Sequence, residues 1–452
     1  MLHTQNRSLA SGSRPVRFST CARRDHMRVL AQMQHYDVAV VGAGPAGLSA
    51  AAALQVATQS QKSIHVFEKT AMTARGAAIL VGPNGLKALH AVDPALLEGM
   101  LAKATKLEGS DRYNMYTGEH MEYMAMRNEA FQEKYGFHNA LLGWSDITGA
   151  LKSALPQASI STGCPVTGYK QQDDGTIQLL GPAASSSASS DAEVIATCNI
   201  LIGADGWFSP IRQQLLQDGP PSFKDAVVYR ARIPRPDFMP EHRTKWWVPP
   251  TGPNSGAPLA VFIPLPGGDM VWQCHCPMSM MQEKGLAFDP VKGEASSSHA
   301  SNQQSSSSSA KERCLKVFES FPAVFREVVE ATPERAITEH GLYQRTPEQI
   351  PDGSWGVGNV TLVGDAAHAA YVDGTGLALS LEDAAVLAWH VQQQGLTAGA
   401  LRAYEAERIP RVKAVFELTA KQEAAMKAGV PQRQLLDERA ELLGRQAVAA
   451  DE

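Results

Sequence analysis

The segment Gly42-Ala43-Gly44-Pro45-Ala46-Gly47 has the residue types and the spacing that bind the pyrophosphate of a dinucleotide. Gly42 permits a tight turn, Gly44 lets the backbone approach a phosphate with no Cβ in the way, and Gly47 allows a helix to pack closely on a strand. The N-terminus of that helix then faces the anion. Glu68 follows 21 residues after Gly47, where it is placed to accept hydrogen bonds from a ribose.

Strands and a helix must position these residues. The run from Tyr36 to Val41 is β-branched and apolar and ends abruptly at glycine, which is typical of a buried parallel strand. Leu48 to Ala57 is rich in Ala and Leu and predicts a helix, and Ile64 to Glu68 predicts a second strand. The resulting β-α-β order is the context in which a glycine pattern indicates dinucleotide binding.

Two later strands also end in acidic turns. The first runs through Ile200 to Asp205 and precedes a helix that starts with the signal Ser209-Pro210, and the second runs through Val360 to Asp365. Ligands of open α/β sheets lie beyond the carboxyl ends of the strands, so both aspartates are expected in the same crevice as the glycine turn. Carboxylates there accept from ribitol or ribose hydroxyls, and two of them favour FAD over a nicotinamide dinucleotide alone.

Length and composition set the outer bounds. At 452 residues the chain exceeds one ordinary core, so two packed domains are expected. It has 44% hydrophobic and 19% charged residues and a formal net charge of −5, a globular composition without the basic excess of a nucleic-acid-binding protein. No apolar run reaches about 18 residues, so no transmembrane segment is expected.

The six cysteines lack the paired spacing of a zinc site. The close pair Cys274 and Cys276 lies in a run that alternates like a strand. A structural zinc site needs four ligands. We interpret the pair as two half-buried thiols and expect no metal.

The predicted fold class is α/β, a Rossmann-like FAD-binding domain with an inserted antiparallel β-sheet substrate domain. Four β-rich runs separated by Pro and Gly predict that sheet, at 227–233, 245–248, 259–265 and 270–276. Long helices are expected at 377–391 and 401–426. Two Ser- and Ala-rich segments, 181–192 and 292–310, cannot bury enough apolar area to offset their ordering entropy and are expected to be surface loops.

The expected domain division is discontinuous. It comprises a leader at 1–35, a first part of the FAD-binding domain at 36–222, the substrate domain at 223–344, a second part of the FAD-binding domain at 345–425 and a C-terminal helical tail at 426–452.

The leader has a distinctive composition. Before Tyr36 the chain has six arginines, four serines and one acidic residue. Such Arg-rich, acid-poor leaders are typical of organelle import, so we expect a plastid or a mitochondrion. The alternative is a disordered extension on a cytoplasmic protein.

The motifs and their order resemble those of the p-hydroxybenzoate hydroxylase-like FAD-dependent monooxygenases, a family that includes salicylate hydroxylases and zeaxanthin epoxidases. The resemblance extends from Tyr36 to about Lys421. It rests on the glycine turn, Glu68, Gly203-Ala-Asp-Gly-x-x-Ser-x-x-Arg212 and Gly364-Asp-Ala-Ala-His368. Further matches are Arg75-Gly76-Ala77-Ala78-Ile79, Pro83-Asn84-Gly85, Tyr343-x-Arg345 and Tyr404-Glu405-x-x-Arg408-x-x-Arg411.

The resemblance implies FAD as cofactor and NAD(P)H as co-substrate. It implies that Asp205 belongs to a segment with a dual FAD and NAD(P)H role and that Asp365 meets the ribityl chain. It also implies that Gly374 and Gly376 pass near the isoalloxazine ring, where backbone N–H groups stabilise negative charge. The residues expected to bind cofactor are Gly42, Gly44, Pro45, Ala46, Gly47, Glu68, Lys69, Arg75, Asp205, Gly364, Asp365, Gly374 and Gly376.

The implied activity is hydroxylation or epoxidation of a small aromatic or isoprenoid substrate with NAD(P)H and O2. The flavin supplies the chemistry, so no catalytic side chain is assigned. His368 is interpreted as structural, although a histidine near a flavin is also a candidate acid or base. The sequence indicates no oligomeric state.

Strand alternation predicts an aromatic wall for the substrate pocket, with core packing as the alternative for at least half of its members. The residues are Tyr229, Arg230, Trp246, Trp247, Phe262 and Trp272.

Three departures from the family pattern leave alternatives open. The loop 369–373 lacks a usual proline and is one residue shorter than in many relatives, Ala378 stands where Asn is common, and Trp144 replaces an Arg. The loop favours, as an alternative, a reductase, cyclase or de-epoxidase on the same fold that inserts no oxygen. Ala378 and Trp144 favour a second alternative, a non-catalytic flavin-binding protein.

Overall fold

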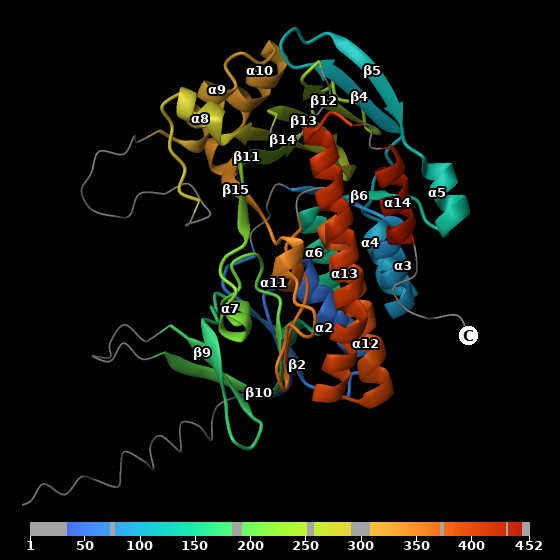
Figure 1. Cartoon of the computed structure of the whole chain (residues 1–452), viewed down its shortest axis with the longest axis vertical. Coiled ribbons are helices and arrows are strands. Elements are labelled where there is room, and N and C mark those ends of the chain that lie inside the picture. Colours follow the sequence, from blue (N-terminus) through green and yellow to red (C-terminus); the bar gives the residue numbers. More distant parts are fainter. Residues whose placement is uncertain are drawn as a thin grey trace, which may run out of the picture.

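The protein is an α/β structure built on two large sheets, which occupy the lower and upper halves of Figure 1. The computed structural model describes residues 34–72, 77–182, 192–250, 257–290, 308–370, 375–430 and 433–444. The predicted fold class is confirmed, because a Rossmann-like half carries a second, β-sheet half.

The lower sheet brings together strands from distant parts of the chain. Its order is β7 (Ile160–Thr162), β2 (Ile64–Glu68), β1 (His35–Val41), β10 (Glu193–Gly203), β9 (Ile177–Gly181) and β8 (Gly168–Gln171), and β16 (Val360–Leu362) also pairs with β10. β1 runs parallel to both β2 and β10, and β10 runs parallel to β16. The carboxyl ends of these four strands therefore lie at one edge of the sheet.

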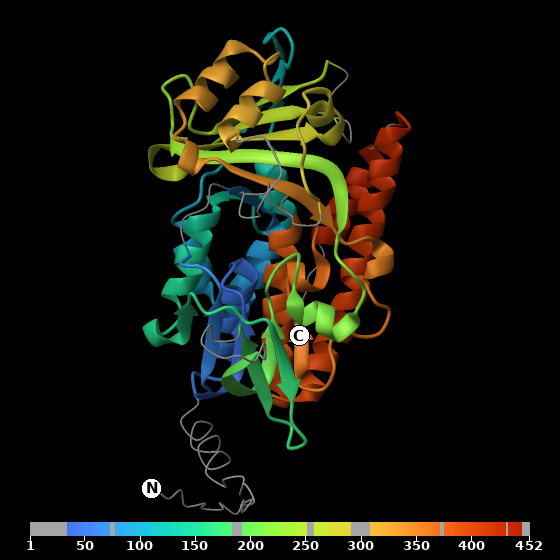
Figure 2. The same cartoon turned by 90° about the vertical axis from the view of Figure 1, so that its left-hand side faces the viewer.

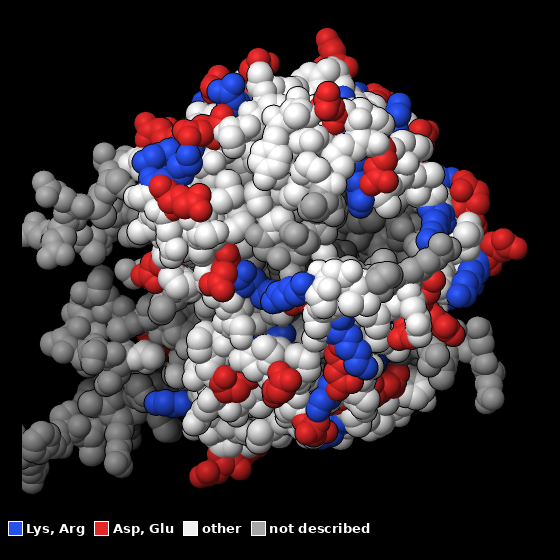
Figure 3. All heavy atoms as spheres, turned by 45° about the horizontal axis from the view of Figure 1, so that its top comes forward, with Lys and Arg blue, Asp and Glu red and all other residues white. Residues whose placement is uncertain are grey.

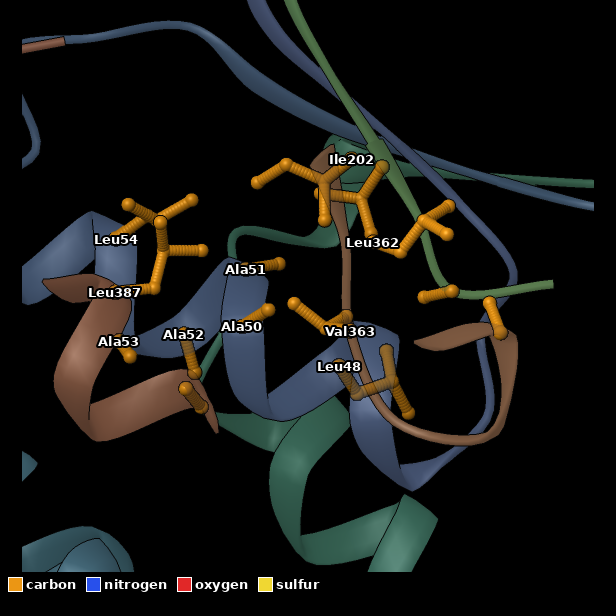
Figure 4. Close-up of a cluster of buried hydrophobic side chains, with 14 of the residues drawn as sticks. Leu48, Ala50, Ala51, Ala52, Ala53, Leu54, Ile202, Leu362, Val363 and Leu387 are labelled. Carbon is orange, nitrogen blue, oxygen red and sulfur yellow. The ribbon is translucent and has the colours of Figure 1, made fainter. Parts of the chain in front are cut away.

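Helix α2 (Pro45–Ala57) packs against this sheet and against α12 (Thr375–Gln394), as Figure 4 shows. Its side chains from Leu48 to Leu54 are almost fully buried, and they share one cluster with Ile202 of β10 and Leu387 of α12. Four consecutive alanines in α2 leave room for α12 to approach closely. This packing fixes the helix that follows the glycine turn.

The other elements of the lower half surround this core. They are β3 (Ala78–Val81), α3 (Pro83–Val92), α4 (Pro94–Leu101), α5 (Asn128–Tyr135), β6 (Ala140–Gly143), α6 (Trp144–Ser153), α7 (Pro210–Leu216), α11 (Asp365–His368), α13 (Ala398–Lys427) and α14 (Arg433–Gly444). No helix within the described ranges is long and apolar enough to cross a membrane.

The upper sheet forms the second half. Its order is β15 (Thr338–Gln344), β11 (Ser222–Pro234), β14 (Asp269–Pro277), β13 (Leu259–Pro264), β12 (Arg243–Val248), β4 (Gly109–Asn114) and β5 (His120–Ala125). Helices α8 (Met278–Glu283), α9 (Ala310–Val317) and α10 (Ala323–Ala331) cover its outer face, away from the lower half (Figures 1 and 2). Its inner face is turned toward the lower half.

The four strands expected between 227 and 276 are all present, but the upper sheet is larger and less regular than predicted. β4 and β5 come from the range 36–222 and join it, and β4 pairs with β12 in parallel, so the sheet is mixed rather than purely antiparallel. β4 reads Gly-Ser-Asp-Arg-Tyr-Asn, a polar run with little strand signal. Its place is set by pairing with a strand more than 100 residues away.

Several predicted boundaries shift by a few residues. The first strand begins at His35, and both long helices extend beyond their predicted ends. The predicted loop 292–310 ends earlier than expected, because Ser309 and Glu312 form a capping box and start α9 at Ala310. Residues 1–33, 183–191 and 291–307 lie outside the described ranges.

Acidic and basic side chains are interspersed over the face shown in Figure 3, without an extended area of one sign. Charges on this face therefore act locally, which agrees with the small net charge of −5.

A buried charge cluster joins α12 to α13. Arg408 is fully buried and donates from Nη1 to Glu382 Oε2 at 2.6 Å and from Nε to Asp383 Oδ1 at 2.8 Å. Arg411 bonds both oxygens of Glu382 at 2.6 Å, and Asn84 Nδ2 of α3 donates to Oε1 at 2.8 Å. The carboxylates of Glu382 and Asp383 are stable in the interior because these hydrogen-bond and ion-pair partners compensate their charges.

We expect Arg408→Met to lower the free energy of unfolding by about 3 kcal/mol or more, because it leaves the buried Asp383 without its arginine and Glu382 with Arg411 alone. Urea unfolding followed by circular dichroism measures this change. Lys413→Gln on the same helix is the control, since Lys413 pairs with the exposed Asp352. Equal losses in the two variants would contradict the role of the buried cluster.

Candidate functional site

Three turns meet at the carboxyl edge of the lower sheet. Val41 lies opposite Gly203, and Gly203 lies opposite Leu362, so β1, β10 and β16 end side by side. Backbone hydrogen bonds continue past the strands, from Ala204 N to Val41 O at 2.8 Å and from Val363 N to Gly203 O at 2.9 Å. The predicted meeting of the three strand ends is therefore present.

The turns touch where glycine leaves room. Gly42 has a φ of +106°, and a Cβ there would lie 2.3 Å from Ala204 O. A Cβ on Gly47 would lie 1.9 Å from Gly42 O, and one on Gly364 would lie 2.4 Å from the Cβ of Ala46. Only glycine fits these three positions, because no side chain tolerates such distances.

Gly44 differs from the other glycines of the turn. A Cβ on Gly44 would meet no described atom within 4 Å, so open space lies in front of it. Gly44 caps α2 without a side-chain hydrogen bond, and Pro45 is the first helical residue. The N–H groups of the first turn therefore point toward that space, which suits a pyrophosphate.

Glu68 ends β2 beside this turn. Its Oε2 accepts from Ala43 N at 2.9 Å, and its Oε1 accepts from Thr70 N at 2.8 Å and from Thr70 Oγ1 at 2.7 Å. The carboxylate thus fixes the glycine turn, and its remaining lone pairs are available to ribose hydroxyls. Lys69 is exposed next to it.

Asp205 lies just after β10. Ile211 N donates to its Oδ2 at 3.3 Å, whereas its buried Oδ1 has no hydrogen-bond partner among the described residues. Burial raises the pKa of Asp205 to about 6, although hydrogen bonds from Ser209 and Ile211 and the charge of Lys69 act to lower it. An acceptor left without a donor in a buried position fits a ligand that brings hydroxyl groups.

Asp365 begins α11. Burial raises its pKa to about 6, against the charge of His368 and a hydrogen bond from the Trp207 side chain, which lower it. A Cβ on Gly376 would lie 3.7 Å from Asp365 Oδ1, so the start of α12 adjoins this carboxylate. The structure thus brings Gly376 and Asp365 together, while Arg75 and Gly374 lie outside the described residues.

Arg212 locks the Asp365 turn, a role not assigned from the sequence although Arg212 ends one of the recognised motifs. It is 1% exposed, and its Nη1 donates to the carbonyls of Ala366 and Ala367 at 3.1 and 2.5 Å. Its Nε donates to Asp218 at 3.0 Å. The guanidinium therefore ties α11 to α7.

His368 is fully buried, and its Nε2 lies 2.6 Å from Asp383 Oδ2, which also accepts from Gly364 N at 2.8 Å. Although burial raises it, the charges of His368 and Arg408 bring the pKa of Asp383 down to about 2. This geometry supports a structural role for His368. The sequence contained a signal for these buried partners that was not recognised, namely the acidic pair Glu382-Asp383 inside a largely apolar helix.

The structure shows the surroundings of two departures from the family pattern, Ala378 and Trp144. Ala378 is 2% exposed where α3 crosses α12, and a Cβ on Gly85 would lie only 2.9 Å from its Cα. The small side chain of Ala378 and the absence of one at Gly85 therefore permit α3 and α12 to cross this closely. Trp144 is the first residue of α6, half-buried, and its backbone N–H donates to Ala77 O at 2.8 Å. Most of the third departure, the loop 369–373, lies outside the described residues.

The predicted aromatic wall is divided between the two faces of the upper sheet. Tyr229, Trp247, Phe262 and Trp272 belong to the outer core that includes Phe325 of α10, so core packing holds for these four residues. Arg230 and Trp246 are half-buried and alternate to the inner face. Their neighbours there include Gln273 and His275, which sequence reasoning did not single out.

The inner face contacts the lower half through several of the described residues, and two of these contacts lie on opposite sides of the sheet. Arg232 Nη1 bonds Asp146 Oδ2 at 3.0 Å and Ser145 Oγ at 2.8 Å in α6. At the other side, the ring of His340 in β15 meets that of Trp207 with centroids 6.1 Å apart. These contacts hold the sheet over the edge where the three turns meet.

The cysteines of β14 lie on the outer face. Cys274 and Cys276 are fully buried rather than half-buried as predicted, and Cys274 Sγ lies 3.8 Å from Cys314 Sγ of α9. The described ranges contain no group of three His, Cys, Asp or Glu side chains that could hold a metal ion.

A glycine turn with open space at the start of a helix, next to two buried carboxylates, suits a dinucleotide cofactor such as FAD. A family model described as "FAD binding domain" matches residues 35–419. The chain therefore belongs to the FAD binding domain family.

Sequence relatives agree with this assignment. The chain is 26% identical over 385 residues to 3-amino-4-hydroxybenzoate 2-monooxygenase of Streptomyces cremeus, a match that covers 84% of each protein. It is 27% identical over 390 residues to 3-hydroxybenzoate 6-hydroxylase 1 of Aquipseudomonas alcaligenes, covering 84% of this chain and 87% of the relative.

A solved structure shares the fold. HpxO from Klebsiella pneumoniae, complexed with FAD and uric acid, superposes with a TM-score of 0.65 at 21% identity and covers 91% of this chain and 93% of its own. The protein is thus an FAD-dependent oxidoreductase of the aromatic-ring hydroxylase type.

We expect Gly44→Ala to weaken FAD binding by about tenfold or more, because the added methyl group occupies the space where we expect the phosphates to bind. The FAD-free fold should remain intact, because this methyl group would contact no described atom of the protein. Flavin fluorescence titration and thermal unfolding of the FAD-free protein measure the two effects. Gly47→Ala is the comparison: its Cβ meets Gly42 O at 1.9 Å, so it lowers the unfolding temperature as well. A loss of stability in Gly44→Ala similar to that in Gly47→Ala would contradict the assignment.

FAD affinity is expected to fall as the pH drops from 7 to 5. The pKa of Asp365 is raised to about 6, so the carboxylate that we expect to accept ribityl hydroxyls becomes protonated over this interval. A ligand that donates to the ionised form binds more tightly above this pKa. Titrations at several pH values should show this slope, and Asp365→Asn should reduce it, with Asp205, whose pKa is also raised to about 6, contributing the remainder. An equal slope in the variant would exclude Asp365 as its source.

Proposed function

We propose that the protein is a monooxygenase that uses NAD(P)H and O2 to hydroxylate a small aromatic substrate. One oxygen atom of O2 is inserted into a ring C–H bond, and the other is reduced to water by two electrons that NAD(P)H supplies as a hydride, with one proton taken from solvent. Relatives named as hydroxybenzoate and hydroxynicotinate hydroxylases or monooxygenases support this reaction.

The observation that carries the proposal is the arrangement of the two halves. Three strand ends meet at the cofactor edge, and the inner face of the upper sheet is held over that edge by the Arg232–Asp146 ion pair and the Trp207–His340 contact. A flat substrate placed between them is shielded from water on both sides, as this chemistry requires.

The residues of the chain then bind and orient. Gly44 and the first turn of α2 hold the pyrophosphate, Glu68 holds the ribose and Asp365 the ribityl chain. When bound, FAD supplies the redox chemistry, so no side chain needs to act as a nucleophile. Arg212 and Asp383 keep the Asp365 turn in position.

The test uses purified protein loaded with FAD. We expect one of 3-hydroxybenzoate, 3-amino-4-hydroxybenzoate or 6-hydroxynicotinate to stimulate NADH or NADPH oxidation together with O2 uptake. Under isotopically heavy O2, mass spectrometry should show one heavy oxygen atom in the ring product.

Two outcomes would contradict the proposal. Reduction of the flavin by NAD(P)H and turnover without heavy oxygen in the product would indicate the reductase-type alternative. Failure of both NADH and NADPH to bleach the flavin, with and without each compound, would indicate a flavin-binding protein that lacks turnover.

A further inference from the structure

The upper sheet ends at β5, a strand with one free edge. β5 pairs with β4 and is the last strand in the order of the sheet, and no other described strand pairs with it. In Figure 1 it is the outermost strand at the upper right. A free edge presents a row of backbone N–H and C=O groups, which is a template for another extended strand.

β5 lacks the features by which proteins protect such an edge. All of its residues are exposed, and the strand contains neither Lys nor Pro. Its single carboxylate, Glu122, is paired with Arg112 Nη1 at 2.9 Å. The register shift in the β4–β5 pair lies toward the turn, between Arg112 and Tyr113, so pairing is regular from Glu122 to Ala125. This part of the edge can therefore accept a second strand.

The β4–β5 hairpin also exposes large apolar side chains. Tyr116 in the turn is 60% exposed, and Met121, Tyr123 and Met124 of β5 are 39%, 47% and 43% exposed. A Cβ on Gly109 of β4 would lie 2.5 Å from the Tyr123 ring, so this ring packs on its own sheet rather than across the free edge. Contiguous exposed apolar side chains mark interaction sites.

Opposite charges flank β5 at its two ends. Glu119 directly precedes the strand, and Arg127 follows shortly after its end. Glu119 accepts a hydrogen bond from Thr117 Oγ1 at 3.2 Å, and Arg127 pairs at 3.7 Å with the exposed Asp437, so both side chains remain accessible to a partner. A strand that is acidic at its start and basic at its end is complementary to a copy that runs in the opposite direction.

The edges of a second copy favour pairing of β5 with itself. β15, at the other end of the upper sheet, is half-buried or buried along its length. Pairing of β5 with a different strand would also leave one free edge on each copy and extend into a filament. A two-fold axis at Tyr123 instead places Glu119 opposite Arg127 of the second copy and Met121 opposite its Ala125.

We propose that β5 is the interface for a second copy of this chain, with the two β5 strands antiparallel about a two-fold axis at Tyr123. The upper sheets of the two copies then form one continuous sheet. Backbone hydrogen bonds make the pairing, the exposed Met and Tyr side chains lose apolar area to water, and the Glu119–Arg127 pairs fix direction and register. The inference goes beyond the proposed function and does not depend on it.

The size of the hairpin sets the strength of this interface. A strand of this length spans about 20 Å, so two paired hairpins bury an area near the lower limit of about 1,200 Å² for stable interfaces. We therefore expect a dimer that dissociates on dilution, with a dissociation constant in the micromolar range.

Sedimentation velocity of the full-length, FAD-loaded protein between about 1 and 100 µM tests the proposal, and we expect the dimer to form over this range. Glu119→Arg and Arg127→Glu each place like charges opposite one another, so each should raise the dissociation constant about tenfold or more. The double variant exchanges the two charges and should recover to within about threefold of the wild type.

Two lysine variants test the edge itself. Ala125→Lys adds a charge to the pairing edge and should leave only monomer at every concentration. Val56→Lys is the control, because Val56 is an equally exposed apolar residue of α2, 47% exposed, and should leave the dimer unchanged. Flavin absorption and thermal unfolding confirm that each variant is folded. A monomeric wild type, a dimer that survives Ala125→Lys, or a double charge variant as weak as the single ones would overturn the proposal.

A membrane surface is the other occupant that an exposed apolar hairpin could have. Cosedimentation with phosphatidylcholine vesicles tests it, and we expect no binding. A monomeric protein that binds the vesicles, and loses this binding in Met124→Lys, would overturn the proposal. Activity separates the inference from the proposed function: a β5-dependent dimer without hydroxylation would reject only the proposed function, whereas hydroxylation by a monomeric wild type would reject only the dimer.

Discussion

Close contact between the glycine turn and two neighbouring strand ends is the constraint on which the site depends. A Cβ at Gly42 would lie 2.3 Å from Ala204 O, and one at Gly364 would lie 2.4 Å from the Cβ of Ala46. Any side chain there would separate the turns and move Asp205 and Asp365 away from the start of α2. Backbone packing thus sets the positions of Asp205, Asp365 and the start of α2 relative to one another.

The buried charges extend this constraint to the helices. Asp383 accepts from Gly364 N and from Arg408 Nε and pairs with His368, so one carboxylate connects the Asp365 turn, α12 and α13. Arg212 holds the same turn from the side of α7. Charges buried this deeply are tolerated because every one of these ions has a partner, and their directional bonds fix the geometry.

Strand alternation gives the upper sheet two faces of different composition. Its outer face carries the aromatic residues that pack against α10, including Phe262 and Trp272. Its inner face carries Arg230, Gln273 and His275. Because successive side chains point to opposite faces, the inner-face side chains can change without disturbing the outer core.

The sequence by itself determined the local parts: the glycine turn, the acids after β10 and β16, the Ser209 cap of α7 and most strands of the upper sheet. These depend on backbone sterics and side-chain alternation over a few residues, which a sequence pattern records. Only the tertiary structure decided that β4 and β5 join the upper sheet, that Arg212 reaches α11 and that Glu382 and Asp383 meet Arg408. It also decided which strand face turns inward, leaving four of the six predicted wall residues in the outer core. The two-residue period of a strand sorts its side chains into two sets, but it does not say which set faces inward. Pairings between residues that are far apart in the chain exist only once the chain has folded.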